Sequence, residues 1–353
     1  MEIKITKNPN KPNLPKESEL GFGTYFTPHM LTVDYDEKNG WHNAEIKPFA
    51  NISLHPASTV LHYGAEIFEG LKAYRTKDGS VQLFRPMENV RRMNRSAERM
   101  SLPEMDEDEM LGLITAFVKF EQEYVPYSFG TSLYLRPFLF GNDEALGVHA
   151  VKHAKFMLIA SPSGSYYKEG INPVKIMIEE EDVRTVRGGT GYAKCGGNYA
   201  ASTRAGERAN QKGYSQVLWL DGVHRKYIEE VGAMNVMFKI DGVIVTPKLT
   251  GSILPGITRK SCIEVLKSKG YTVEERLLSV DELILALKEG RLEEAFGCGT
   301  AAVVSPIGRL MYKDEEYVIG EEKIGEVTQW LYDTLTGIQW GKITDSYGWV
   351  YKI

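Results

Sequence analysis

The sequence lacks paired cysteines, a dense basic tract and a long apolar run, and each absence excludes a class of protein. Its three cysteines, Cys195, Cys262 and Cys298, include no C-x-x-C pair. This argues against a disulfide framework or a zinc ribbon and predicts a reducing, cytoplasmic location. The 42 basic and 47 acidic residues give a net charge of −5, so nucleic acid, which needs clustered positive charge, is not an expected partner. No apolar run approaches the roughly 18 residues of a membrane helix, so no membrane partner is expected.

Metal-binding patterns are missing as well. His149 and His153 are spaced as i and i+4, but the segment HAVKH lacks the glutamate of an H-E-x-x-H zinc site. We therefore expect these histidines at the surface, and we expect no metal site.

The residues that are present are typical of a globular protein. The chain has 353 residues, of which 42% are hydrophobic and 25% charged, and at about 150 residues per domain this length predicts two domains. A segment rich in glycine, serine and proline, residues 161–173, is the predicted boundary. The predicted domains are residues 1–163 and 174–353, joined by a loop at residues 164–173.

The pattern of helices and hairpins predicts an α+β fold. Three turns with Asp-Gly, at Asp78, Asp221 and Asp241, each lie between strand-like segments and indicate β-hairpins. One of these hairpins joins residues 71–75 to residues 81–84. Such antiparallel pairing disfavours a simple dinucleotide-binding domain, whose parallel strands need helical crossovers. Helices are expected over residues 58–68, 88–100, 106–124, 199–212, 258–269, 280–289 and 323–335.

Glycines gather in one window, residues 188–197, which contains five of them. A phosphate-binding G-x-x-x-x-G-K-[ST] motif fails because Gly197 occupies the lysine position, and a G-x-G-x-x-G motif fails because Lys194 replaces the third glycine. What remains is Lys194 with glycines on both sides. A buried lysine loses its charge readily and can form a Schiff base with an aldehyde. The alternative is a solvated lysine in a flexible loop.

If Lys194 carries pyridoxal phosphate, an anion site must hold the phosphate. Thr258 follows L-P-G-I at a predicted helix start, where N–H groups and the helix dipole attract anions. Thr300 lies in the small-residue loop G-C-G-T-A-A, and Arg92 lies on a charge-rich helix. The alternatives are an ordinary N-cap at Thr258, a tight turn at Thr300 and a solvated helix face at Arg92.

The same cofactor needs an acid beside its ring nitrogen and a donor beside its phenolic oxygen. Glu229 and Glu230 end a predicted strand, and its two-residue period sends them to opposite faces, so only one of them can enter a given pocket. Tyr199 follows the glycines and could donate to the phenolic oxygen. Edge charges and a core tyrosine are the alternatives.

Several blocks of the sequence together resemble a known family. KCGGNYAAS, EEVGAMN, LPGITR and FGCGTAA occur in the order and spacing of the fold-type IV pyridoxal-phosphate aminotransferases. FGTYFTPHM, LHYGAEIFEGLKAYR, LFRPMENVRRMNRSAERM and SLYLRPFLFG resemble the branched-chain amino-acid aminotransferases, in their longer bacterial and eukaryotic subtype. The resemblance extends from about Gly21 to Trp340. It implies a two-domain fold with a small N-terminal α/β domain and a larger domain with an antiparallel-rich β core.

The resemblance also implies roles around the cofactor, pyridoxal 5′-phosphate. Lys194 would form the Schiff base and act as general acid and base, and Glu230 would bind the pyridine nitrogen. Tyr199 would hydrogen-bond the phenolic oxygen. The residues that would hold the phosphate are Arg92, Ile257, Thr258 and Thr300, with Arg184 supporting the same region.

On the substrate side, the resemblance implies an apolar, aromatic pocket for a branched side chain. Arg136 would receive the distal carboxylate of glutamate, and Ala301 and Ala302 belong to the loop that receives the α-carboxylate. Tyr63 would come from the neighbouring subunit, so the active form would be a homodimer. The positions lining the pocket are Phe26, Tyr63, Phe68, Tyr134 and Tyr166.

The implied reaction is a ping-pong transamination of L-leucine, L-isoleucine and L-valine with 2-oxoglutarate. It yields branched 2-oxo acids and L-glutamate. The alternatives are a D-amino-acid aminotransferase or a 4-amino-4-deoxychorismate lyase of the same fold, and a phosphate-ligand binding protein without catalysis.

Overall fold

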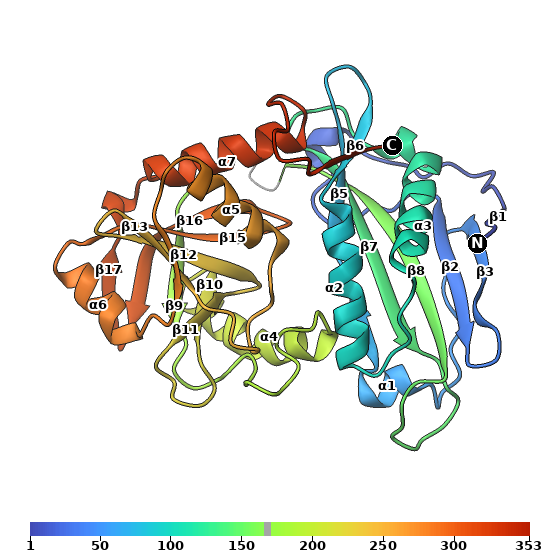
Figure 1. Ribbon diagram of the computed structural model, residues 1–353, viewed down its shortest axis with the longest axis horizontal. Helices are drawn as coiled ribbons and strands as arrows, with labels where there is room; N and C mark the ends of the chain where they lie inside the picture. The colour runs from blue at the N-terminus through green and yellow to red at the C-terminus, as the bar shows by residue number, and fades with distance from the viewer. Residues whose placement is uncertain (166–170) are drawn as a thin grey trace. The chain divides into compact units, whose positions relative to one another are not determined.

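A computed structural model describes residues 1–165 and 171–353, which form two compact units (Figure 1). The first unit comprises the described part of Met1–Tyr166 together with Ala193–Gly196 and Gly337–Ile353. The rest of the described chain, up to Thr336, forms the second unit. Lys194 therefore belongs to the unit that is built mainly from the N-terminal half. Part of the predicted loop at residues 164–173 lies outside the described residues.

The first unit is built on a nine-stranded sheet with the order β1-β3-β2-β8-β7-β5-β6-β18, and β4 pairs with β7. Only β1 and β3 are parallel. The strands are β1 (Lys4–Ile5), β2 (His29–Asp36), β3 (Gly40–Pro48), β4 (Glu66–Phe68), β5 (Leu71–Arg75), β6 (Val81–Phe84), β7 (Ser132–Gly141), β8 (His153–Ser163) and β18 (Val350–Lys352).

One face of this sheet carries the hydrophobic core beneath helices α2 (Pro86–Arg99) and α3 (Glu107–Phe120), which run along it in Figure 1. Successive side chains of a strand point to opposite faces. In β7 the alternate residues Leu133, Leu135 and Leu139 join this core. The residues between them therefore lie on the other face, where the sheet carries polar and aromatic side chains.

Local sequence accounts for where these two helices begin. Pro86 opens α2, because its fixed φ suits the first turn and no N–H donor is needed there. Asp106 caps α3, since its side chain accepts a hydrogen bond of 3.0 Å from the N–H of Glu109. Helix α3 ends at Phe120 and is followed by a 3-10 turn, Gln122–Tyr124. The observed helix is therefore shorter than the one predicted over residues 106–124.

The helix predicted over residues 58–68 is wrong in its second half. Helix α1 covers only Thr59–Tyr63, and Gly64, with a φ of 58°, ends it. Residues 66–68 form strand β4, which pairs with β7 and buries Ile67 completely. The apolar spacing fits a helix, but pairing with a distant strand overrides a local pattern.

The three predicted hairpins are confirmed, since the strands on both sides of each Asp-Gly pair are antiparallel neighbours. Strands β5 and β6 have the predicted bounds and pair antiparallel. Asp241 and Gly242 alone join two strands, with φ values of 50° and 76°, as a type I′ turn requires. Asp221 instead begins a longer loop, where its carboxylate accepts hydrogen bonds from backbone N–H groups between Val223 and Tyr227. The hairpin predicted at Asp221 is therefore present, but a loop longer than the two residues Asp221 and Gly222 connects its strands.

The second unit contains another nine-stranded sheet, in the order β11-β10-β9-β16-β15-β12-β13-β14, with β17 paired to β16. An additional pairing of β11 with β12 closes β9, β10, β11, β12, β15 and β16 into a ring. Most pairs are antiparallel, which agrees with the expected β core. The strands are β9 (Val174–Ile178), β10 (Gln216–Leu220), β11 (Ile228–Val231), β12 (Met234–Ile240), β13 (Val243–Pro247), β14 (Val273–Arg276), β15 (Leu292–Gly299), β16 (Val303–Tyr312) and β17 (Glu315–Val318).

The helices predicted for the second half of the chain are all present, close to the expected positions. They are α4 (Gly196–Gln211), α5 (Ile257–Ser268), α6 (Val280–Lys288) and α7 (Glu326–Gln339). Two short 3-10 segments, Glu17–Glu19 and Gly320–Glu322, complete the helical elements. None of the helices in the described part of the chain is long and apolar enough to cross a membrane.

The segment Gly337–Ile353 completes the first unit. Its strand β18 pairs antiparallel with β6 at the edge of the first sheet. Trp340 lies against Tyr74 with 4.6 Å between ring centroids, and its indole N–H donates to the carbonyl of Thr131 at 3.0 Å. The first sheet thus includes the last strand of the sequence.

Candidate active site

Lys194 lies in a backbone segment that is held from two sides within the first unit. Its N–H donates to the hydroxyl of Ser96 on α2 at 2.9 Å, and its carbonyl accepts from the N–H of Phe68 on β4 at 2.9 Å. The side-chain amine is half-buried and lies 4.9 Å from the centroid of the Phe68 ring. A lysine anchored in this way is not the solvated loop residue of the alternative interpretation.

Two glycines beside Lys194 are required by close approach of other segments. A Cβ on Gly196 would collide with the carboxylate of Glu66, which accepts the Gly196 N–H. A Cβ on Gly191 would collide with the carbonyl of Ser252. These glycines therefore make room for neighbouring protein groups, and Gly196 with Gly197 forms the first turn of α4.

A buried ion pair, Glu69 with Arg92, lies close to Lys194. Arg92 donates through Nε and Nη2 to the two carboxylate oxygens of Glu69, at 2.7 and 2.8 Å, and Asn89 donates to the same carboxylate at 2.8 Å. Burial by itself raises the pKa of Glu69, but the charges of Arg92 and Lys194 and these hydrogen bonds lower it overall. Of the arginines on α2, Arg92 is the buried one, with 3% of its surface exposed.

Arg136 and Tyr134 lie on the face of β7 opposite the hydrophobic core, next to Phe68. The Nη2 of Arg136 donates to the Tyr134 hydroxyl at 2.9 Å, and its guanidinium lies 4.7 Å from the Phe68 ring centroid. Its Nε is buried and has no hydrogen-bond partner among the described residues. The predicted residues Lys194, Phe68, Tyr134 and Arg136 are therefore brought together in one unit.

Two further residues on this face were missed from the sequence. Lys72 on β5 lies directly opposite Tyr134 in the strand register, and burial lowers its pKa from 10.5 to about 7. Phe22 packs edge-on against the Tyr134 ring, with 4.8 Å between centroids. The two-residue period of L-K-A-Y-R, which buries Leu71 and Ala73 in the core, is the signal that could have identified Lys72.

The other residues predicted to line the substrate pocket are Phe26, Tyr63 and Tyr166, and the first two are not among the contacts of Phe68, Tyr134 and Arg136 described above. Phe26 stacks on Phe49 with 5.0 Å between ring centroids. Tyr63 ends helix α1 with 42% of its surface exposed, and its hydroxyl donates to the carbonyl of Leu146. Tyr166 lies outside the described residues.

In the second unit, Glu230 is buried and held from two directions. Arg184 lies 3.1 Å from its Oε1, and the N–H of Leu254 donates to the same oxygen at 2.6 Å. Arg184 also donates to the carbonyls of Gly191 and Ser252, at 3.0 and 2.6 Å. Arg184 thus fixes both the carboxylate and the loop that precedes α5.

Glu229 faces the other side of β11, as the strand period predicts. It is 4% exposed and Glu230 is 2% exposed, so neither is the solvated edge charge of the alternative interpretation. The hydroxyl of Ser252 donates to Oε1 of Glu229. Burial raises the pKa of the Glu229 carboxyl, and this effect outweighs the opposing influence of Ser252 and Arg184.

The predicted phosphate-binding residues of the second unit lie at a helix start and a turn. Gly256, not Thr258, is the N-cap of α5, and as a glycine it contributes no capping side chain. Ile257 and Thr258 therefore lie in its first turn, where backbone N–H groups point outward. Thr300, Ala301 and Ala302 form the turn between β15 and β16. Tyr199 lies on α4 and is half-buried.

These residue types fit a phosphorylated aldehyde cofactor. The first unit offers an amine that is anchored at its backbone, and the second offers a fixed, buried carboxylate and a helix start whose N-cap is a glycine. Within the described residues, no group of histidine, cysteine, aspartate and glutamate side chains is arranged to hold a metal ion. The residues present supply an amine, carboxylates and anion-binding donors.

Comparisons with known proteins agree with this chemistry. Residues 66–310 match the family described as amino-transferase class IV. The chain is 52% identical over 348 residues to a probable branched-chain-amino-acid aminotransferase of Staphylococcus aureus (strain N315), covering 98% of this chain and 97% of that protein. It is 50% identical over 353 residues to branched-chain-amino-acid aminotransferase 2 of Bacillus subtilis (strain 168), covering 100% and 96%.

Among the solved structures of similar fold are two branched-chain amino acid aminotransferases. The branched-chain amino acid aminotransferase from Escherichia coli matches with a TM-score of 0.74 and 28% identity, covering 92% of this chain and 98% of that one. The T.th. enzyme of the same description, solved with pyridoxamine 5′-phosphate, matches with a TM-score of 0.75 and 28% identity, covering 91% and 97%. The expected fold is thereby confirmed.

Proposed function

Because the chain belongs to the amino-transferase class IV family, we propose that it transfers the amino group of L-leucine, L-isoleucine or L-valine to 2-oxoglutarate. The cofactor is pyridoxal 5′-phosphate, in keeping with this family and with the cofactor-bound structures of similar fold. The two substrates would react in alternating half-reactions at the same site. The names and the 50% identity of the relatives support the choice of branched-chain substrates.

The observation that carries this proposal is the position of Phe68 beside both Lys194 and Arg136. The Lys194 amine and the Arg136 guanidinium lie 4.9 and 4.7 Å from the centroid of this one ring. A substrate bound against Phe68 would therefore have an amine and a carboxylate-binding group within reach at once. That is what an enzyme acting on amino acids with apolar or acidic side chains needs.

Arg136 supports the use of both kinds of substrate. An arginine fork pairs well with a carboxylate, and the buried Nε of Arg136 has no partner among the described residues. The distal carboxylate of 2-oxoglutarate would supply the missing acceptor. A branched side chain would instead pack on Phe68 and Tyr134, while the guanidinium keeps its hydrogen bond to the Tyr134 hydroxyl.

The remaining residues would hold the cofactor and move protons. Bound pyridoxal phosphate supplies an aldehyde and an electron-withdrawing ring. Lys194 would bind the aldehyde carbon and later carry a proton between the substrate Cα and C4′, as general acid and base. Glu230 would keep the ring nitrogen protonated, and Tyr199 would donate to the phenolic oxygen. The phosphate would be held by Arg92, Ile257, Thr258 and Thr300, and the substrate α-carboxylate by the turn with Ala301 and Ala302.

We also propose a homodimer in which Tyr63 reaches the partner's site. Around Tyr63, helix α1 and the loop after β7 expose large apolar side chains, a feature of interaction surfaces. The hydroxyl of Tyr63 binds this loop at Leu146. The exposed fractions are 56% for Leu61, 42% for Tyr63, 65% for Leu146 and 82% for Val148.

We propose a cytoplasmic location on the basis of the cysteines. All three are buried free thiols. Thiols in this state are typical of proteins kept in a reducing compartment.

The test of the proposed reaction is a comparison of substrates in the Arg136→Met variant. We expect activity with L-leucine and 2-oxoglutarate and none with D-alanine. In the variant, kcat/KM for 2-oxoglutarate should fall by about 10²-fold, the loss of a charged hydrogen-bonded contact, and kcat/KM for L-leucine should fall much less. Arg95→Met, which removes an exposed arginine of α2, is the control. Equal losses for the two substrates would contradict the role of Arg136.

A further inference from the structure

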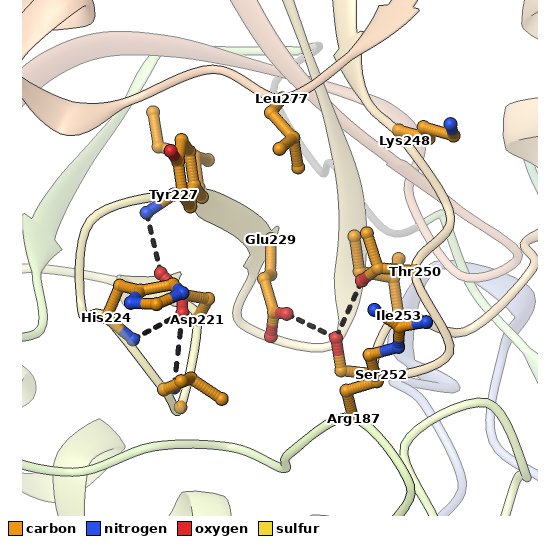
Figure 2. A pocket seen from close by; sticks show the side chains of 13 residues that line it. Arg187, Asp221, His224, Tyr227, Glu229, Lys248, Thr250, Ser252, Ile253 and Leu277 are labelled. Atoms are coloured by element: carbon orange, nitrogen blue, oxygen red, sulfur yellow. Dashed lines mark hydrogen bonds between the residues drawn. The ribbon is translucent and has the colours of Figure 1, made fainter.

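A cavity of about 300 Å³ lies in the second unit, on the Glu229 side of strand β11. Its wall is built by the loop after β10, the segment after β13 and Leu277, as Figure 2 shows. The volume is at the lower end of the range for sites of small molecules. The lining residues used below are Arg187, Asp221, Val223, Glu229, Lys248, Ser252, Ile253 and Leu277.

Glu229 gives this cavity an unused buried acceptor. The side chain is 96% buried, given its 4% exposure, and it lies in the middle of the cavity wall in Figure 2. Its Oε1 accepts the hydroxyl of Ser252, while Oε2 has no hydrogen-bond partner among the described residues. A buried oxygen without a partner favours a ligand that brings an N–H or O–H donor.

The charges around the cavity define the ligand further. Arg187 and Lys248 bring two positive charges, and Asp221 and Glu229 bring two carboxyl groups. The Asp221 carboxylate already accepts hydrogen bonds from the backbone of its own loop. The acceptor that remains for a ligand donor is therefore Glu229. A simple cation would meet the charges of Arg187 and Lys248, and a simple anion would meet Glu229, so a ligand with both charges fits best.

The wall also carries the apolar side chains of Val223, Ile253 and Leu277, beside uncharged polar groups such as Thr250. We propose that this cavity binds a small apolar α-amino acid as a zwitterion. Its ammonium group donates to Oε2 of Glu229, its carboxylate pairs with Arg187 or Lys248, and its side chain packs on the apolar wall. This inference does not depend on which amino acids the enzyme converts.

The position of this site connects it to the predicted cofactor residues. Glu229 accepts the hydroxyl of Ser252, and Glu230 accepts the N–H of Leu254, so the two carboxylates hold the same loop from opposite faces of β11. That loop leads into Gly256 and the start of α5. An amino acid on Glu229 would therefore contact the segment that positions this helix start.

Calorimetric titration of the holoenzyme, reduced with borohydride so that it cannot turn over, tests the site. L-leucine is titrated into the wild type, into Leu277→Glu and into Leu285→Glu, a matched change at an exposed leucine of α6 outside the cavity. We expect a binding event that Leu277→Glu weakens by about tenfold or more and that Leu285→Glu leaves unchanged. Glu229→Gln and the double variant Arg187→Met/Lys248→Met, which removes both cations of the cavity, should weaken the same event.

Two analogues of leucine test whether the site needs both the ammonium and the carboxylate group of the ligand. Isoamylamine carries only the amine and 4-methylvalerate only the carboxylate, and each should bind this site about tenfold more weakly than L-leucine or worse. The proposal is overturned if no binding event responds to Leu277→Glu, or if either analogue binds the responsive site as well as L-leucine does. Because the reduced enzyme has no turnover, failure here leaves the substrate comparison with Arg136→Met independent.

Discussion

Each unit contains a buried pair of glutamate and arginine, and the two pairs are built differently. In the first unit, Arg92 meets Glu69 with both arms of its fork, at 2.7 and 2.8 Å. In the second unit, Arg184 touches Glu230 at 3.1 Å and also donates to the backbone carbonyls of Gly191 and Ser252. In the Glu69 pair both arms of the arginine fork bind one carboxylate, which also accepts from Asn89 and the N–H of Gly70, whereas the Glu230 pair is part of a network that positions a loop.

This difference shows how the same two residue types serve different ends. Two parallel hydrogen bonds give a carboxylate and a guanidinium one fixed mutual geometry. An arginine shared among two carbonyls and one carboxylate instead links a titratable group to the backbone around it. We therefore expect the Glu69 pair to matter most for stability, and the Glu230 pair to matter most for turnover.

The largest expected effect is the loss of kcat when Lys194, whose amine lies near the Glu69–Arg92 pair, is replaced. Lys194→Ala should lower kcat by about 10²–10⁴-fold or more, because a general acid and base contributes that much and the cofactor also loses its attachment. The measurement is single-turnover kinetics with L-leucine at saturating cofactor. Lys119→Ala, an exposed lysine of α3, is the control. A wild-type rate in Lys194→Ala would remove this lysine from the mechanism.

The comparison of the pairs is tested by Glu69→Gln and Glu230→Gln. Glu69→Gln leaves Arg92 buried without its counter-charge, and breaking such a pair costs about 3–5 kcal/mol of the free energy of unfolding. Glu230→Gln should cost less, because Arg184 keeps its two carbonyl acceptors. Urea unfolding gives the stabilities and steady-state assays give kcat.

For kcat we expect the opposite ranking of the two variants: Glu230→Gln should lose more activity than Glu69→Gln. Gln at position 230 cannot supply the negative charge that keeps a ring nitrogen protonated. If both variants lost stability and kcat in the same proportion, the distinction between a stabilising bidentate pair and a positioning network would be wrong.

The smallest expected effect concerns Lys72, a buried lysine on the face of the first sheet opposite the α2 and α3 core. Burial lowers its pKa from 10.5 to about 7, so between pH 7 and 10.5 the unfolded chain binds more protons than the folded one. Stability due to this group therefore rises with pH through that window and is lost as the pH falls toward 7. Lys72→Met should remove this dependence, whereas the exposed Lys119→Met should retain it. Urea unfolding at pH 7 and pH 9.5 measures it, and equal slopes in Lys72→Met and wild type would contradict the shift.

Local sequence patterns predict many elements of this fold. The strands at residues 71–75 and 81–84 have the predicted bounds because a short turn joins them. The predicted turn at Asp241 is present because Asp-Gly suits positive φ. Residues 66–68 could not be predicted, since their pairing partner β7 lies far along the chain. The loop at Asp221 was missed because a side chain that caps several backbone N–H groups can replace a tight turn.

The candidate site shows the same division between local and distant information. The strand period places Glu229 and Glu230 on opposite faces, but it does not say that both are buried. Four arginines on α2 are equivalent as a pattern, and it is Glu69 on a distant segment that singles out Arg92. The family resemblance suggests Lys194, Phe68 and Arg136 together, yet only the structure gives the two cation contacts on one ring.

Completion of the first unit by the last strand has a consequence during synthesis. On the ribosome, N-terminal domains generally fold before later parts of the chain are made. Here strand β18 pairs with β6, and Trp340 packs on Tyr74, so the β6 edge of the first sheet stays unpaired until residues 350–352 have emerged. From the synthesis of β6 to that of β18, therefore, the nascent chain carries an unpaired β edge, the kind of surface on which chaperones act and from which aggregation starts.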